Sequence, residues 1–239
     1  NITEDYVNKI LNKKHKVRFK KKYDHNKIGY INGLYATTAG IGGLTTIEVL
    51  RTTYSNTFLE LILTGSQGDV MKESVKCAKT IAWNLLPEKI RFDLNNKYNN
   101  KENTEEKSVG TFGLHIHTPE CATPKDGPSA GAAITLGILS QLCNLEVCND
   151  VAMTGEIDLN GNVTIIGGLY SKIQGAYKAG IKKVLIPLEN EKDLDLIIQE
   201  NKISEIQDKN IDFNVIKVST IYDMIPHVFI SNNIKFNKL

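Results

Sequence analysis

The sequence has little of what marks several large classes of protein. It has four cysteines and no C-x-x-C pair, which is typical of a reducing compartment and argues against a disulfide framework. Its longest apolar run, GAAITLGIL, is about half of what a membrane span needs. The phosphate-binding motif G-x-x-x-x-G-K-[ST] does not occur. These features disfavour a disulfide-stapled domain, a membrane-spanning helix and a P-loop nucleotide site.

Composition and charge are those of an ordinary globular protein. The chain is 41% hydrophobic and 23% charged, and its formal net charge of +2 says little about its partners. With 239 residues it can bury a substantial core, as one large domain or as a domain with an appendage. Basic residues gather between Lys13 and Lys27. This pattern is typical of a solvated linker, with nucleic-acid contact as the less favoured alternative.

Three parts of the chain differ in composition. Residues 1–27 are polar and basic, and we interpret them as the tail of a preceding domain followed by a linker. Residues 28–239 have the patterns of a globular domain. Within them, residues 94–107 are rich in Asn, Lys and Glu and predict a disordered surface insertion. The chain starts with Asn1 instead of Met, so we expect an excised fragment of a longer protein.

Strand and helix patterns alternate along the globular part. Strands are predicted within residues 28–36, 44–54, 57–66, 111–119, 182–187 and 213–218. Helices are predicted within residues 69–86, 129–143, 169–180, 190–200 and 220–229, of which 129–143 is apolar all round and therefore central. Residues 151–168 predict two strands about the turn Asn160-Gly161. The alternation predicts an α/β (α+β) fold with mixed sheets packed with helices.

A candidate nucleophile lies in the stretch Gly127-Pro128-Ser129-Ala130-Gly131, which fits the pattern G-x-S-x-G. In α/β-hydrolases this pattern places a serine on a turn that follows a buried strand directly. Here three prolines precede or flank Ser129 within ten residues. Because proline cannot donate to a sheet ladder, the approach to Ser129 is predicted to be an extended loop, and the hydrolase elbow is rejected.

A lysine is the alternative base for this serine. A serine hydroxyl needs an adjacent base, and a lysine can act only if its pKa is lowered from about 10.4 toward 7–8. Lys172 lies in the first turn of the helix predicted after Gly167-Gly168, on the flank of its apolar face. Burial and the positive end of the helix dipole would both lower the pKa of this amine. Ser129 and Lys172 are therefore a candidate catalytic pair.

From the residues alone, less specific interpretations stay open. Lysines beside apolar helix faces commonly extend to water, and serines in Gly/Pro loops are mostly turn residues. His115 and His117 share one strand face, with Glu120 and Cys121 nearby. Zinc needs three or four well-placed ligands, so this group does not predict a metal site.

A family resemblance favours the pair. The stretches HIHTPECATPKDGPSAGAAIT and DVAMTGEIDLNGNVTIIGGLYSKIQGAYKAGIKKVLIP closely resemble the proteolytic domain of Lon, an ATP-dependent AAA+ serine protease. The resemblance runs from about residue 28 to about residue 228, and it implies that Ser129 is the nucleophile and Lys172 the base. It also implies supporting roles for Thr154, Asp126 and Glu48. In the family, the position of Asp126 is linked to active and inactive conformations of the site.

The resemblance also implies a function and its setting. It implies a serine endopeptidase with a Ser-Lys dyad that cleaves unfolded or damaged polypeptides. The fragment itself would hold no cofactor, because ATP and Mg²⁺ would bind an ATPase module upstream of it. In the full-length family six subunits form a ring, and we expect no membrane partner. We expect the mitochondrial matrix, with another organelle or the bacterial cytoplasm as alternatives. A catalytically inactive binding module on the same fold is the alternative function.

Overall fold

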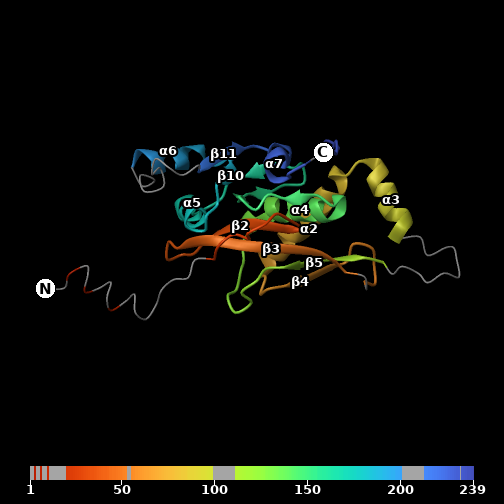
Figure 1. Cartoon of the computed structure of the whole chain (residues 1–239), viewed down its shortest axis with the longest axis horizontal. Coiled ribbons are helices and arrows are strands. Elements are labelled where there is room, and N and C mark those ends of the chain that lie inside the picture. The colour runs from red at the N-terminus through yellow and green to blue at the C-terminus, as the bar shows by residue number, and fades with distance from the viewer. Residues whose placement is uncertain are drawn as a thin grey trace.

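The centre of the molecule is a mixed seven-stranded sheet, in the order β11-β10-β7-β2-β3-β5-β4 (Figure 1). The computed structural model describes residues 20–52, 55–98, 111–200, 213–231 and 233–239, and the single residues 3, 6 and 10. The strands of the sheet are β2 (Tyr30–Ala36), β3 (Gly42–Thr52), β4 (Leu61–Thr64), β5 (Gly113–His117), β7 (Val151–Met153), β10 (Lys183–Pro187) and β11 (Asn214–Val218). The predicted mixed sheet is confirmed.

Strand direction changes within this sheet. β2 and β3 form an antiparallel hairpin, and β5 continues the antiparallel pairing. β7 lies parallel to both β2 and β10, and β11 lies parallel to β10. Two small antiparallel pairs lie outside the sheet: β1 (Lys27–Ile28) with β6 (Glu146–Val147), and β8 (Glu156–Ile157) with β9 (Val163–Thr164). The last pair is the hairpin predicted about Asn160-Gly161, and Gly161 has a φ of +81°.

Both faces of the sheet are covered by helices. The helices are α2 (Asp69–Leu85), α3 (Glu88–Tyr98), α4 (Gly131–Cys143), α5 (Leu169–Lys178), α6 (Glu191–Gln199) and α7 (Ile221–Val228), with short 3₁₀ turns η1 (Pro128–Ala130) and η2 (Leu188–Asn190). Ile47 and Val49 of β3 face a core shared with α2, α4 and α7. Leu44 points to the opposite face and packs with α5 and α6, because side chains alternate along a strand.

Helix α4 lies at the centre of the larger core. All of its residues from Gly131 to Leu142 are buried, as expected for a helix that is apolar on every side. It packs against α2 and against strands β2 and β3. The prediction of a central buried helix is confirmed.

The predicted disordered insertion is wrong at its beginning. Residues 94–98 form the last part of α3. Leu94 is buried, and the ring of Tyr98 lies 4.5 Å from that of Phe112 in an edge-to-face contact. Leu94 and Tyr98 are four residues apart and share one helix face. Two apolar anchors therefore fix this turn despite its polar composition, while residues 99–107 lie outside the described residues.

Residues 20–26, which we call the N-terminal strap, are hydrogen-bonded to the globular part. The Lys21 amine donates to the carbonyl of Lys178 at 2.7 Å, and the backbone N–H of Lys22 donates to the carbonyl of Ala179 at 3.3 Å. These carbonyls lie at the C-terminal end of α5, where a helix favours positive charge. The strap thus caps α5, and the division at residue 27 stays a prediction.

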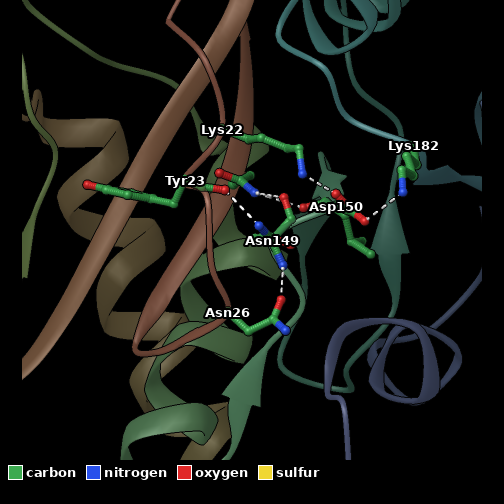
Figure 2. A network of polar contacts seen from close by, with 8 residues as sticks. Lys22, Tyr23, Asn26, Asn149, Asp150 and Lys182 are labelled. Atoms are coloured by element: carbon green, nitrogen blue, oxygen red, sulfur yellow. Dashed lines mark hydrogen bonds and ion pairs between the residues drawn. The ribbon is translucent and has the colours of Figure 1, made fainter.

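A polar network holds the strap in place (Figure 2). The ammonium groups of Lys22 and Lys182 approach the carboxylate of Asp150 from two sides, the second at 3.3 Å. The hydrogen bond from Lys22 lowers the pKa of Asp150. Beside it, the Asn149 amide donates to the carbonyl of Tyr23 at 2.7 Å. The strap is therefore joined both to the end of α5 and to the turn before β7.

No helix among the described residues is long and apolar enough to cross a membrane.

Candidate functional site

Ser129 lies in the 3₁₀ turn η1, directly before α4. Strand β5 ends at His117, and a loop through Gly127 separates it from the serine. Gly127 has a φ of +124°, a conformation that glycine adopts without strain. As predicted, Ser129 follows a loop and not a strand. Ser129 is half-buried.

Lys172 lies in the first turns of α5, whose N-cap is the left-handed Gly168. Only 4% of its surface is exposed. Burial disfavours the ammonium form and lowers the pKa of Lys172 to about 8. The sequence predicted two causes for this lowering: burial accounts for the value of about 8, and Lys172 also lies near the N-terminal end of α5, as the second cause requires. An amine with this pKa is partly neutral near neutral pH.

Thr154 joins the segments that carry Lys172 and Ser129. The Lys172 amine donates to Thr154 Oγ1 at 3.0 Å, and the Thr154 hydroxyl donates to the carbonyl of Ser129 at 3.3 Å. The N–H of Gly155 donates to the same carbonyl at 2.8 Å, and the N–H of Thr154 donates to Leu185 of β10 at 3.1 Å. These bonds place three distant segments at one buried point.

Thr154 joins the Lys172 amine to the backbone of Ser129 and not to its hydroxyl. Among the described residues, no hydrogen bond joins Ser129 Oγ to Lys172 Nζ. Catalytic hydrogen bonds are often long or misaligned without substrate. Any mechanism that uses the pair therefore needs the Ser129 hydroxyl and the Lys172 amine to come within hydrogen-bond distance when substrate binds.

Asp126 points toward α2 and not toward Lys172. Its Oδ1 accepts hydrogen bonds from the N–H groups of Met71 and Gly127, both at 2.9 Å. It supplies the cap that α2 lacks, because the N-cap residue Gly68 has no side chain. A Cβ on Gly68 would lie 2.4 Å from the Asp126 carboxyl carbon, so this approach needs glycine. Asp126 thus fixes the loop before Ser129 on the end of α2.

Glu48 lies farther along β3, and its hydrogen-bond partner is the N-terminal strap. Its Oε1 accepts a hydrogen bond from the Tyr23 hydroxyl at 2.8 Å. Burial and this bond raise the pKa of Tyr23. In the described part of the chain, Glu48 makes no hydrogen bond to Ser129, Thr154 or Lys172. The structure therefore places Glu48 with the strap.

His115 and His117 share one hydroxyl. Thr64 Oγ1 lies 2.8 Å from Nε2 of His115 and 2.7 Å from Nδ1 of His117. The described residues contain no group of three or more His, Cys, Asp or Glu side chains placed to hold a metal ion. The imidazoles thus have a protein partner in Thr64.

Comparison with known proteins identifies the family. The model of the Lon protease (S16) C-terminal proteolytic domain matches residues 1–230. The chain is 44% identical over 196 residues to the Lon protease of Buchnera aphidicola subsp. Baizongia pistaciae, covering 82% of this chain and 23% of that protein. It is 40% identical over 231 residues to the Lon protease of Campylobacter jejuni, covering 96% and 27%.

A viral protein is similar to the same degree. The Lon protease homolog of Acanthamoeba polyphaga mimivirus is 40% identical over 200 residues, covering 82% of this chain and 18% of that protein. The chain thus spans between 18% and 27% of the length of these three relatives. The fold and these matches define a protease domain. The chain belongs to the Lon protease C-terminal proteolytic domain family.

Proposed function

We propose that this chain is a serine endopeptidase in which Ser129 is the nucleophile and Lys172 the general base. The observation that carries the proposal is the buried Lys172 amine, whose pKa is lowered to about 8 and which Thr154 holds beside the Ser129 segment. A base is most effective when its pKa lies near the working pH. In such a site a lysine can do what histidine does in other serine hydrolases.

The reaction proceeds through an acyl-enzyme. Ser129 Oγ attacks the peptide carbonyl carbon while neutral Lys172 Nζ takes the hydroxyl proton, and the carbonyl oxygen becomes an oxyanion. The tetrahedral intermediate collapses, the C–N bond breaks, and the Lys172 ammonium gives the proton to the leaving amine. Water then attacks the ester with Lys172 again as base, and Ser129 regains its proton when the acid leaves.

Two features of the fold support these steps. Ser129 lies at the start of α4, where backbone N–H groups and the helix dipole favour a negative oxygen. Thr154 accepts the hydrogen bond from Lys172. This contact orients the amine toward the serine loop and leaves its lone pair available once the lysine is neutral.

The substrate and the setting are parts of the same proposal. We propose unfolded or damaged polypeptides as substrates, and a homo-oligomeric ring in the longer protein. ATP and Mg²⁺ would act in a separate upstream module, with no cofactor in this chain. For the compartment, the mitochondrial matrix and the bacterial cytoplasm stay alternatives, because the relatives described above are bacterial and viral.

Two substitutions test the dyad. Ser129→Ala removes the nucleophile. Lys172→Arg keeps the positive charge, but its guanidinium does not lose a proton at any workable pH and so cannot act as a base. Both should abolish cleavage of a fluorogenic peptide, with circular dichroism showing an intact fold. Lys192→Arg, on the exposed side of α6, is the matched control and should retain activity.

The pH profile separates lysine from histidine. The cleavage rate should rise with pH through one ionisation near 8, because the neutral amine is the active form. Replacing His115, His117 or His227 singly should leave turnover. An active Lys172→Arg variant would falsify the dyad, and a wild-type chain that cleaves no peptide would favour the inactive binding module.

A further inference from the structure

Helix α5 lies on the β2–β3 hairpin with backbone against backbone. A Cβ added to Gly42 would lie 1.9 Å from the carbonyl oxygen of Ser171 and 2.9 Å from the backbone nitrogen of Lys172. No side chain other than hydrogen fits at this distance. The peptide group that joins Ser171 to Lys172 therefore rests directly on β3.

A second glycine makes the same contact from the side of the helix. A Cβ added to Gly175 would lie 2.4 Å from the nitrogen of Gly43 and 2.5 Å from the carbonyl carbon of Gly42. Gly42 and Gly175 do not have the positive φ that favours glycine. Space, and not backbone conformation, is therefore the reason that these positions need glycine.

One hydrogen bond fixes α5 in this close contact with the β2–β3 hairpin, which we call the seat of α5. The Ser171 hydroxyl donates to the carbonyl of Gly40 in the hairpin turn at 2.9 Å. The partner of the Lys172 amine, Thr154, is held separately by Leu185 of β10. The distance between the amine and Thr154 thus depends on how deeply α5 lies on the hairpin.

We propose that Gly42 and Gly175 are positioning residues for Lys172. Their missing side chains, together with the Ser171 hydrogen bond, let α5 lie close enough to β3 to hold the Lys172 amine away from water and beside Thr154. The inference rests on the proposed function for its effect on catalysis, but not for its effect on Lys172 itself.

The depth of the helix controls the proton affinity of the amine, because burial is the cause of its lowered pKa. Titratable or charged residues on α5 and on the elements packed against it are Tyr170, Tyr177 and Lys178 on α5, Tyr30 and Tyr35 on β2, Glu48 and Arg51 on β3, Glu191, Lys192, Asp193 and Asp195 on α6, and Lys21 and Lys22 on the N-terminal strap. Near Thr154 and Ser129 lie Glu156 and Asp126. None of these contributes to the shift. A change in burial should therefore appear directly in the titration.

Gly175→Ala tests the inference. The added methyl would push α5 outward by about 1 Å to reach a normal contact distance. Water would then reach the amine, and its titration midpoint should rise by about one pH unit. The midpoint is measured by NMR on protein with ¹³C,¹⁵N-labelled lysine, and the Lys172 resonance is identified by its loss in Lys172→Met.

The catalytic consequence has its own signature. A rise of about one unit reduces the neutral fraction about tenfold at pH 7. Peptide cleavage by Gly175→Ala should therefore fall about tenfold at pH 7 and recover toward the wild-type rate as the pH is raised to 10. A structural loss of folded protein would instead reduce the rate equally at both values.

Gly167→Ala is the matched control, because a Cβ at Gly167 meets nothing within 4 Å. It should leave the midpoint unchanged. If Gly175→Ala does not fold, Ser171→Ala replaces it, since it loosens the same seat without adding bulk. An unchanged midpoint in the folded variant would overturn the inference. A raised midpoint without a matching shift of the rate profile would support the inference and contradict Lys172 as the base.

Discussion

Thr154 shows how one buried hydroxyl can serve two neighbours. It accepts a hydrogen bond from Lys172 and donates one to the carbonyl of Ser129. Removal of the hydroxyl in Thr154→Val should reduce peptide cleavage about 10- to 100-fold, because the amine loses its orientation toward the serine loop. Thr154→Ser keeps the oxygen and should retain most of the activity. The kcat values of the two variants are compared, and equal values would contradict the orienting role.

The burial of Lys172 should also be visible in stability. The folded-state pKa of about 8 lies below the unfolded value near 10.5, so the unfolded chain binds more protons between these two values. Stability then rises with pH across this window, and below pH 8 the folded state carries the full cost of a buried ammonium.

Lys172→Met removes that cost. It should raise the free energy of unfolding at pH 7 by about 2 kcal/mol, and the gain should shrink as the pH rises toward 10.5. Urea unfolding at pH 7 and pH 10 measures the difference. Lys192→Met, on the exposed side of α6, is the control, and a destabilised Lys172→Met would count against a costly buried charge.

The sequence indicates some of these site residues and misses the reason for their placement. Motif and helix position make Ser129 and Lys172 candidates because both signals are local, and the family resemblance then favours the pair. The direction of Asp126 toward α2 and of Glu48 toward Tyr23 depends on segments far away in the chain. The glycine doublet Gly42-Gly43 is visible in the sequence, but the sequence does not show what packs against it. Its meaning appears only when α5 is placed on it.

The contacts of the N-terminal strap predict how the stability of the fold depends on pH in acid. Its partner Asp150 has a pKa lowered by Lys22, so this ion pair stabilises the fold above the unfolded pKa of about 3.8. That stabilisation is lost as the pH falls through the lower folded-state value. Asp150→Asn should therefore reduce the free energy of unfolding by about 1 kcal/mol at pH 7 and by less at pH 2.

Chemical unfolding at the two pH values checks this expectation. Asp69→Asn is the control, because the Asp69 side chain is 96% exposed in its pair with Lys72. If Asp150→Asn lowers the free energy of unfolding by the same amount at both pH values, the packing of this side chain and not its charge stabilises the fold.

The alternation of helices and strands could be predicted because each element carries its own periodicity. The helices at 69–85, 131–143 and 169–178 fall within the predicted ranges. The order of strands in the sheet could not be predicted, since β2 lies between β3 and β7, and β7 is far from it in the chain. Composition predicts disorder for residues 94–98, because it does not reveal that Leu94 and Tyr98 have partners.

At the scale of the whole molecule, the chain should cleave short peptides weakly and without ATP. It has the proposed site but no P-loop motif. Stably folded proteins should not be cleaved, because the chain has no P-loop motif with which ATP could drive their unfolding. The assay compares a fluorogenic peptide, an unfolded protein and a stably folded protein, each with and without ATP and Mg²⁺. A rate that ATP increases would contradict this expectation.

The seat of α5 on the hairpin also bears on the order of folding. Gly40 and Ser171 are 131 residues apart in the chain, and contacts of such separation form late because a long loop must close first. Until they form, Lys172 is exposed to water as an ammonium ion with an ordinary pKa, and it cannot serve as the proposed base. If Lys172 is the base, as proposed above, a chain that is still folding, with its own peptide bonds exposed, lacks a working base. Under the proposed function, the contact between α5 and the hairpin therefore couples the activity to the folding of the chain.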